Sequence, residues 1–233
     1  MPVQIAALDD YQEVARELGP WERLASLPDL KLLVTTGMGT ASIDMEAARE
    51  LGITVCGTAS LPSPTAELTW GLIIALQRNL LEEDLRIREG GWQRTIGPEL
   101  AGRTLGILGL GTLGRRVARV AQAFEMEVIA WSENLTPQDA AEAGAQAVGR
   151  DELFERADVL TIHTRLSDRT RGLVGARELG LMKETAILVN TSRGPIVDED
   201  ALLKALRTGA IAGAALDVYT KAVSYTHLTL PTN

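Results

Sequence analysis

The sequence predicts an α/β fold in two halves, each built on a parallel sheet with helices on both faces. Short apolar runs alternate with amphipathic helical stretches, a pattern typical of doubly wound sheets. One of these runs leads through a glycine-rich turn directly into a helix. The segment from Gly90 to about Arg103 shows neither pattern and is expected to connect the two halves.

In the first half, apolar runs predict strands at 3–8, 31–36 and 53–55. Helical spacing predicts helices near 13–24 and 45–51, and a long helix from Pro64 toward Arg88. Pro64 suits the first turn of that helix, where a backbone N–H is not needed. Cys56 follows an apolar run and is expected to be a small buried side chain.

The second half begins at Thr104 and alternates strand and helix repeatedly. Strands are predicted at 104–108, 127–131, 158–163, 186–190 and 211–218, with helices near 138–143, 152–156 and 199–208. In such sheets ligands bind at the carboxyl ends of the strands. The glycine-rich turn, His163 and the segment Asn190–Arg193 all fall at those ends.

The glycine-rich turn, Gly109-Leu110-Gly111-Thr112-Leu113-Gly114, has the G-x-G-x-x-G pattern of a dinucleotide-phosphate site. The first glycine permits a tight turn, the second lets the backbone approach a pyrophosphate, and the third lets helix and strand pack closely. The helix N-terminus then offers free N–H groups to the phosphates. Apolar residues recur at helical spacing after the turn: Val117, Val120, Ala121 and Phe124.

Composition narrows the function classes. The chain of 233 residues has a net charge of −8, which argues against a nucleic-acid partner or an anionic membrane. No apolar run reaches the length of a membrane span, and no metal site is expected. One cysteine excludes an internal disulfide and favours a reducing compartment, so we expect a cytoplasmic protein.

The chain resembles the D-isomer-specific 2-hydroxyacid dehydrogenases, because several of that family's motifs occur along the sequence in the family's order. The motifs are Leu8-Asp9-Asp10, Ala66-Glu67-Leu68, Gly106-Ile107-Leu108-Gly109-Leu110-Gly111, Leu173-Val174-Gly175, Asn190-Thr191-Ser192-Arg193-Gly194 and Ala214-Ala215-Leu216-Asp217-Val218. The resemblance implies two Rossmann-like domains. Residues 1–98 would form part of the substrate domain, and residues 99–221 an NAD-binding domain cut short before its last strands.

The resemblance also implies hydride transfer between a nicotinamide and the C2 carbon of a small 2-hydroxy or 2-oxo acid. Arg193 matches the family's arginine beside the substrate carboxylate and carbonyl, where negative charge develops. Met38, Gly39 and Thr40 match the loop whose N–H groups hold the carboxylate. A plain glycine turn is a nearly equal alternative for that loop, because relatives often carry Arg-Asn at positions 39 and 40.

Cofactor contacts are expected from residues that follow the strands. They are Gly109, Gly111, Thr112, Leu113, Gly114, Ser132, His163, Thr164, Thr191 and Asp217. NAD-selective sites usually carry an acidic residue where Ser132 stands, and no arginine adjoins Ser132 to receive a 2′-phosphate. We therefore expect NAD, with NADP left open.

Two of these residues have alternative interpretations. His163 ends an apolar strand, and a hydrogen-bonded, partly buried histidine is its first interpretation, followed by cofactor contact and then by acid–base chemistry. Asp217 matches the aspartate that meets the nicotinamide amide, and its alternative is a strand-end cap. Arg165 stands where the family usually has proline.

The end of the sequence departs from the family. After Lys221 the family continues with Glu-Pro, and that glutamate orients a catalytic histidine further on. Here Ala222 takes the glutamate's place, and residues 222–233 resemble a translated sequencing adapter, so His227 is not a replacement. We expect this tail to be non-native and the chain, a fragment without its proton donor, to be inactive.

Two alternatives to a D-2-hydroxyacid dehydrogenase remain open on the sequence. One is the formate or phosphonate dehydrogenase branch of the same fold. The other is an NAD-sensing regulatory protein that binds cofactor without turnover. The expected partner is a small-molecule acid, and the resemblance implies that the intact parent is a homodimer.

Overall fold

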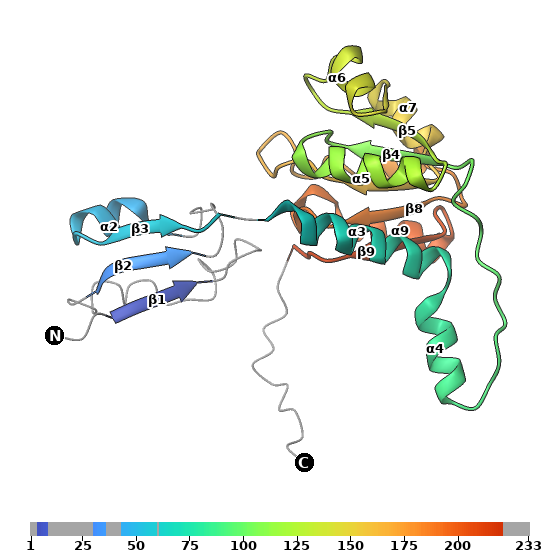
Figure 1. Ribbon diagram of the computed structural model, residues 1–233, viewed down its shortest axis with the longest axis horizontal. Helices are drawn as coiled ribbons and strands as arrows, with labels where there is room; N and C mark the ends of the chain where they lie inside the picture. The colour runs from blue at the N-terminus through green and yellow to red at the C-terminus, as the bar shows by residue number, and fades with distance from the viewer. Residues whose placement is uncertain (1–3, 9–29, 36–42, 60, 221–233) are drawn as a thin grey trace. The chain divides into compact units, whose positions relative to one another are not determined.

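The computed structural model describes residues 4–8, 30–35, 43–59 and 61–220 (Figure 1). The described residues divide into two compact units, with the boundary between Leu61 and Pro62. We expected the functional domains to divide after residue 98. The structure assigns the helices between Pro62 and residue 98 to the same compact unit as the larger sheet. The limits of the functional domains themselves stay a prediction.

The first unit contains a parallel sheet in the order β1-β2-β3, with strands β1 (Gln4–Leu8), β2 (Leu30–Thr35) and β3 (Thr54–Gly57). Helix α2 (Met45–Glu50) precedes β3, and the Asp44 side chain caps it by accepting the N–H groups of Glu46 and Ala47. These strands and this helix confirm the predicted elements. The helix expected near 13–24 lies outside the described residues.

The apolar side chains of this unit form a small core that includes Leu33, Ala48 and Ile53. Cys56, which we expected to be buried, is exposed. That expectation was wrong because β3 ends the described sheet and only one of its four residues is even half-buried.

The second unit is a parallel sheet of six strands in the order β6-β5-β4-β7-β8-β9. The chain runs outward from β4 to β6 and then returns to the other side of β4, so the order reverses between β4 and β7. That reversal is the switch point at which doubly wound sheets bind ligands. The strands are β4 (Thr104–Leu108), β5 (Glu127–Trp131), β6 (Gln146–Ala147), β7 (Val159–Ile162), β8 (Ile187–Asn190) and β9 (Gly213–Leu216).

Helices cover both faces of this sheet, as expected (Figure 1). Side chains alternate across each strand, so Leu105 and Ile107 of β4 join one apolar core and Leu108 joins the other. The first core includes side chains of α3 (Pro62–Gln77), α5 (Thr112–Ala123) and α6 (Pro137–Glu142). The second includes those of α7 (Arg150–Arg156), α8 (Ala176–Leu181) and α9 (Glu199–Thr208).

The long helix expected from Pro64 to Arg88 is two helices, α3 and α4 (Leu80–Arg88). Asn79 separates them in a left-handed conformation with φ 51°. A short polar side chain tolerates that conformation, which ends the regular helix. Three elements of the second unit were not predicted: the two-residue strand β6, helix α8 and the short 3-10 helix η2 (Gly194–Ile196).

Candidate functional site

The three glycines of the turn between β4 and α5 meet different surroundings. Gly109 has φ +105°, and a Cβ there would lie 2.7 Å from the backbone nitrogen of Thr164. A Cβ on Gly114 would lie 2.3 Å from the carbonyl oxygen of Gly109. A Cβ on Gly111 would meet nothing within 4 Å. Two glycines therefore permit close packing, and the middle one faces open space.

That open space lies at the N-terminus of α5. Gly111 is the N-cap and provides no side-chain hydrogen bond, so the first N–H groups, including those of Thr112 and Leu113, have no capping side chain. Exposed N–H groups and the helix dipole attract phosphate at such an end. The residues present therefore suit the pyrophosphate of a dinucleotide.

The end of β5 is tied to the glycine turn. The backbone nitrogen of Gly109 donates to the carbonyl oxygen of Trp131 at 2.9 Å. Ser132 Oγ accepts a hydrogen bond from the backbone nitrogen of Leu110, also at 2.9 Å. Ser132 thus lies beside the turn, as its predicted role requires, and it brings no carboxylate to the position that discriminates against a 2′-phosphate.

His163 follows β7 on the other side of the turn. Its Nε2 lies 3.0 Å from the hydroxyl of Thr161, while its Nδ1 is shielded from solvent and has no hydrogen-bond partner among the described residues. Burial lowers the pKa of His163 to about 4, so the ring is neutral at pH 7. The first interpretation, a hydrogen-bonded and partly buried histidine, agrees with the contact to Thr161, although Nδ1 makes no hydrogen bond to a described residue. A neutral ring with this pKa is a poor proton donor.

The segment after β8 forms a tight polar turn. The side chain of Asn190 donates to the carbonyl oxygen of Arg193 at 3.0 Å and accepts from the backbone nitrogen of Ser192 at 2.9 Å. Ser192 Oγ donates to the carbonyl oxygen of Thr164, which joins this turn to the end of β7. No role was expected for Asn190 or Ser192, although an Asn at the end of a strand is a turn signal.

Arg193 is half-buried, and its Nη1 donates to the carbonyl oxygen of Ser192 at 2.8 Å. None of the ion pairs between described residues includes Arg193. Its charge is therefore not neutralised by a carboxylate in that part of the chain. The next residue, Gly194, lets the chain pass closely, because a Cβ there would lie 2.1 Å from the backbone of Tyr219.

The other predicted site residues lie as follows. Thr191 is buried, and its hydroxyl is 2.9 Å from that of Thr69 on α3. Asp217 is exposed, and its backbone nitrogen donates to the carbonyl oxygen of Asn190 at 3.0 Å. The expected substrate loop, Met38, Gly39 and Thr40, lies outside the described residues. The structure thus brings together the glycine turn, Ser132, Thr164 and, through Ser192, the Arg193 turn.

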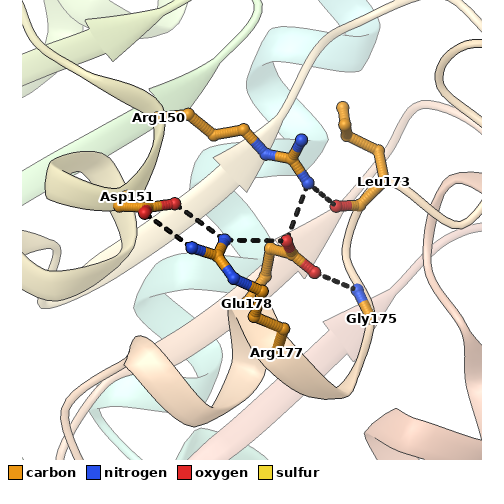
Figure 2. Close-up of polar contacts among 6 residues, drawn as sticks. All are labelled: Arg150, Asp151, Leu173, Gly175, Arg177 and Glu178. Atoms are coloured by element: carbon orange, nitrogen blue, oxygen red, sulfur yellow. Dashed lines mark hydrogen bonds and ion pairs between the residues drawn. The ribbon is translucent and has the colours of Figure 1, made fainter.

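Charged side chains brace the loop that follows β7 (Figure 2). Arg150 on α7 donates to the carbonyl oxygen of Leu173 at 3.1 Å and to the buried carboxylate of Glu178 at 2.7 Å. Glu178 also accepts from the backbone nitrogen of Gly175. Burial alone would raise the pKa of Glu178, but backbone hydrogen bonds and the charge of Arg150 outweigh it and lower the pKa. The outer end of the loop is therefore held by ionised groups.

Two kinds of feature are missing from the described residues. No group of three or more His, Cys, Asp or Glu side chains there is placed to hold a metal ion. No helix there is long and apolar enough to cross a membrane.

A family model described as D-isomer specific 2-hydroxyacid dehydrogenase, NAD binding domain, matches residues 70–231. The chain belongs to this family. The family is one of oxidoreductases, and this chain contains its NAD-binding domain of the Rossmann type. The resemblance seen in the sequence is confirmed. The nucleotide-binding interpretation of the glycine turn agrees with this assignment.

Relatives of this family chain carry several names. A glyoxylate reductase of Aeropyrum pernix is 46% identical over 206 residues, which cover 84% of this chain and 62% of the relative. A D-3-phosphoglycerate dehydrogenase of Methanocaldococcus jannaschii is 41% identical, over 82% of this chain and 37% of the relative. The chain thus spans less than two thirds of the length of these relatives.

Among solved structures, a phosphoglycerate oxidoreductase of Vibrio cholerae O395 superposes with a TM-score of 0.84 at 34% identity. The superposition covers 95% of this chain and 86% of that chain. The pyruvate reductase of Chlamydomonas reinhardtii gives a TM-score of 0.82 at 30% identity, over 94% of this chain and 64% of that one. These likenesses support the α/β architecture as well as the family.

Proposed function

We propose that the chain is the cofactor-binding part of an NAD-dependent D-2-hydroxyacid dehydrogenase, which transfers hydride between a nicotinamide and a small 2-hydroxy or 2-oxo acid. The observation that carries this proposal is the glycine turn, whose middle glycine faces open space at an uncapped helix N-terminus. The names of the relatives make glyoxylate the first 2-oxo acid to test.

The proposal gives separate tasks to the two sides of the switch point. The turn around Gly111 and the first N–H groups of α5 would hold the pyrophosphate, and Ser132 would lie beside the adenosine ribose. Arg193 would hold the substrate carboxylate and stabilise charge on the reacting oxygen, because no carboxylate among the described residues neutralises it. The bound cofactor supplies the hydride.

We further propose that the 233 residues, made as such, bind cofactor but turn over slowly. The reaction needs a proton donor at the substrate oxygen. Among the described residues the one histidine is His163, and its pKa of about 4 leaves it neutral at pH 7. Neither the family's glutamate nor its histidine is matched by a residue of this sequence.

The experiment measures binding and turnover on the same full chain. Titration with NADH, followed by calorimetry, should give saturable binding. Reduction of glyoxylate with NADH should run about 100- to 10,000-fold slower than in a full-length relative, the usual contribution of a general acid. Absence of NADH binding would refute the cofactor proposal, and turnover at the relative's rate would refute the proposed inactivity.

We also propose that the protein is cytoplasmic and that its parent is a homodimer. The proposal of a homodimer is supported by the arm formed by α4 and residues 89–99. This arm extends away from the six-stranded sheet (Figure 1). None of the residues of α4 is buried. The arm exposes apolar side chains that suit a second copy: Leu80, Leu81, Leu85, Ile87, Trp92 and Ile96.

A further inference from the structure

The loop after β7, residues 163–172, carries an arginine that the proposed function does not use. Arg165 is exposed, and none of the ion pairs between described residues includes it. An exposed arginine alone indicates little. Its position at the carboxyl end of a central strand, one residue after Thr164, is what makes it informative.

The backbone next to Arg165 touches the glycine turn. A Cβ on Gly109 would lie 2.7 Å from the backbone nitrogen of Thr164 and 2.8 Å from the carbonyl carbon of His163. On the opposite side, Ser132 Oγ binds the backbone nitrogen of Leu110 in the same turn. Strands β5 and β7 flank β4, so their ends are about 10 Å apart, twice the usual strand spacing. Ser132 and Arg165 therefore stand across the turn from each other.

The loop is held in place at several points. Ser192 donates to the carbonyl oxygen of Thr164, and Thr170 Oγ1 donates to that of Arg165 at 2.7 Å. Arg150 holds the far end at Leu173 (Figure 2). The backbone of Arg165 is thus fixed beside the turn while its long side chain reaches solvent. An anion bound here would therefore have to order the side chain alone, because the backbone is already held.

The carboxylate that usually repels a second phosphate is missing from the end of β5, and the exposed Glu133 lies one residue further along. NAD-selective sites place a carboxylate at the end of the second strand, and here that place belongs to the neutral Ser132, whose Oγ is engaged with Leu110. A guanidinium matches phosphate geometry through its planar set of donors. An uncompensated arginine across from Ser132 therefore favours a ligand with charge on the adenosine ribose.

We propose that Arg165 binds the 2′-phosphate of NADP and so lets the site accept NADP as well as NAD. This inference rests on the proposed function, since it concerns the same cofactor site. Its ligand class is a 2′-phosphorylated adenosine. The arginine comes from the loop after the fourth strand of the sheet domain in chain order, not from the end of the second strand where such a residue is usually sought.

The test uses calorimetric binding of 5′-AMP and of adenosine 2′,5′-bisphosphate to the full chain, because these two ligands differ by the 2′-phosphate alone. Arg165→Gln should weaken binding of the bisphosphate about five-fold, the scale of one exposed charge pair, and leave 5′-AMP unchanged. Arg165→Lys should retain part of the affinity. High salt should shrink the difference between the two ligands in the unmodified chain.

Arg207→Gln is the matched control, because it removes the same charge from an exposed position in the last turn of α9. It should change neither affinity. An unchanged ratio of the two affinities in Arg165→Gln would overturn the proposal, and so would equal loss of both ligands, which indicates contact with the adenine instead. If the unmodified chain binds neither NADH nor NADPH, the proposed function itself fails. Binding of both with no effect of Arg165→Gln overturns this inference alone.

Discussion

The environment of His163 makes the free energy of unfolding depend on pH in a defined window. In an unfolded chain the imidazole gains a proton below about pH 6.5, whereas burial lowers the pKa of His163 to about 4 in the folded chain. Between these values the unfolded state binds more protons, so the free energy of unfolding decreases as pH falls. We expect a loss of up to about 3 kcal/mol between pH 6.5 and 4, measured by urea denaturation.

The variant His163→Gln provides the comparison. A glutamine does not titrate, and its amide can replace Nε2 opposite Thr161, so most of the pH dependence in this window should disappear. Asp158 does not contribute to the pH dependence of stability in this window. Burial would raise the pKa of Asp158, but a hydrogen bond from Lys183 helps to lower it, so its contribution is lost below its ordinary value of 3.8. Equal slopes in both proteins would show that His163 is not the titrating group.

The β4–α5 turn separates two roles of glycine that a sequence motif presents together. Gly114→Ala would place a Cβ 2.3 Å from a backbone oxygen, so α5 must move from β4 and stability should fall by about 2 kcal/mol. Gly111→Ala has open space and an ordinary φ of −82°. The free energy of unfolding of Gly111→Ala should lie within about 0.5 kcal/mol of that of the unmodified chain. Its NADH affinity should fall about tenfold, because the added methyl group occupies the phosphate position.

Thermal melts and NADH titrations of the two variants decide this prediction together. Loss of binding in Gly111→Ala with an unchanged melting temperature assigns the open space to the cofactor. Full NADH affinity in Gly111→Ala would contradict the phosphate site at this helix end, whatever the stability of Gly114→Ala.

The elements differed in how well the sequence predicted them. Buried strands such as β4 and β8 are continuous apolar runs, so they were predicted to within one residue. The break at Asn79 was missed because helical periodicity continues across it, and the left-handed conformation of one asparagine leaves no apolar signal. Strand β6 has two residues, too few for any period. Helix α8 carried only half of a start signal: Glu178 accepts from the backbone nitrogen of Gly175, but a glycine N-cap has no side chain to complete a capping box.

The site shows the same division. Glycine spacing identified the turn, because the pattern follows directly from backbone sterics. The hydroxyl of Ser132 binding Leu110, and Asn190 closing the Arg193 turn, depend on contacts between segments far apart in the chain or on the conformation of one turn. Residue types alone did not specify those partners.

The α4 arm has a defined internal structure although none of the residues of its helix is buried. The carboxylate of Glu83 accepts hydrogen bonds from the backbone nitrogens of Arg94 and Thr95, and Arg86 donates to the carbonyl oxygen of Trp92 at 2.8 Å. These bonds fix the two sides of the arm to each other. Its apolar side chains nevertheless remain exposed, and such a patch marks an interaction surface.

A second copy of the chain suits this surface because the charges of α4 are self-complementary. Acidic residues Glu82 and Glu83 lie in its first turn and basic residues Arg86 and Arg88 in its last. Two such helices packed antiparallel about a two-fold axis would place opposite charges together. Leu81 and Leu85, one turn apart on the same face, would then be buried between the copies.

The double variant Leu81→Glu, Leu85→Glu should therefore convert a dimer into a monomer of 25.0 kDa, measured by light scattering after gel filtration. Both side chains are at least 60% exposed in the single chain, so the monomer should keep its fold and its circular dichroism spectrum. Leu203→Glu on α9 changes an exposed leucine outside the arm and should leave the dimer intact. If the unmodified chain is monomeric, these 233 residues do not self-associate through the arm. If the double variant is still a dimer, the dimer interface lies elsewhere.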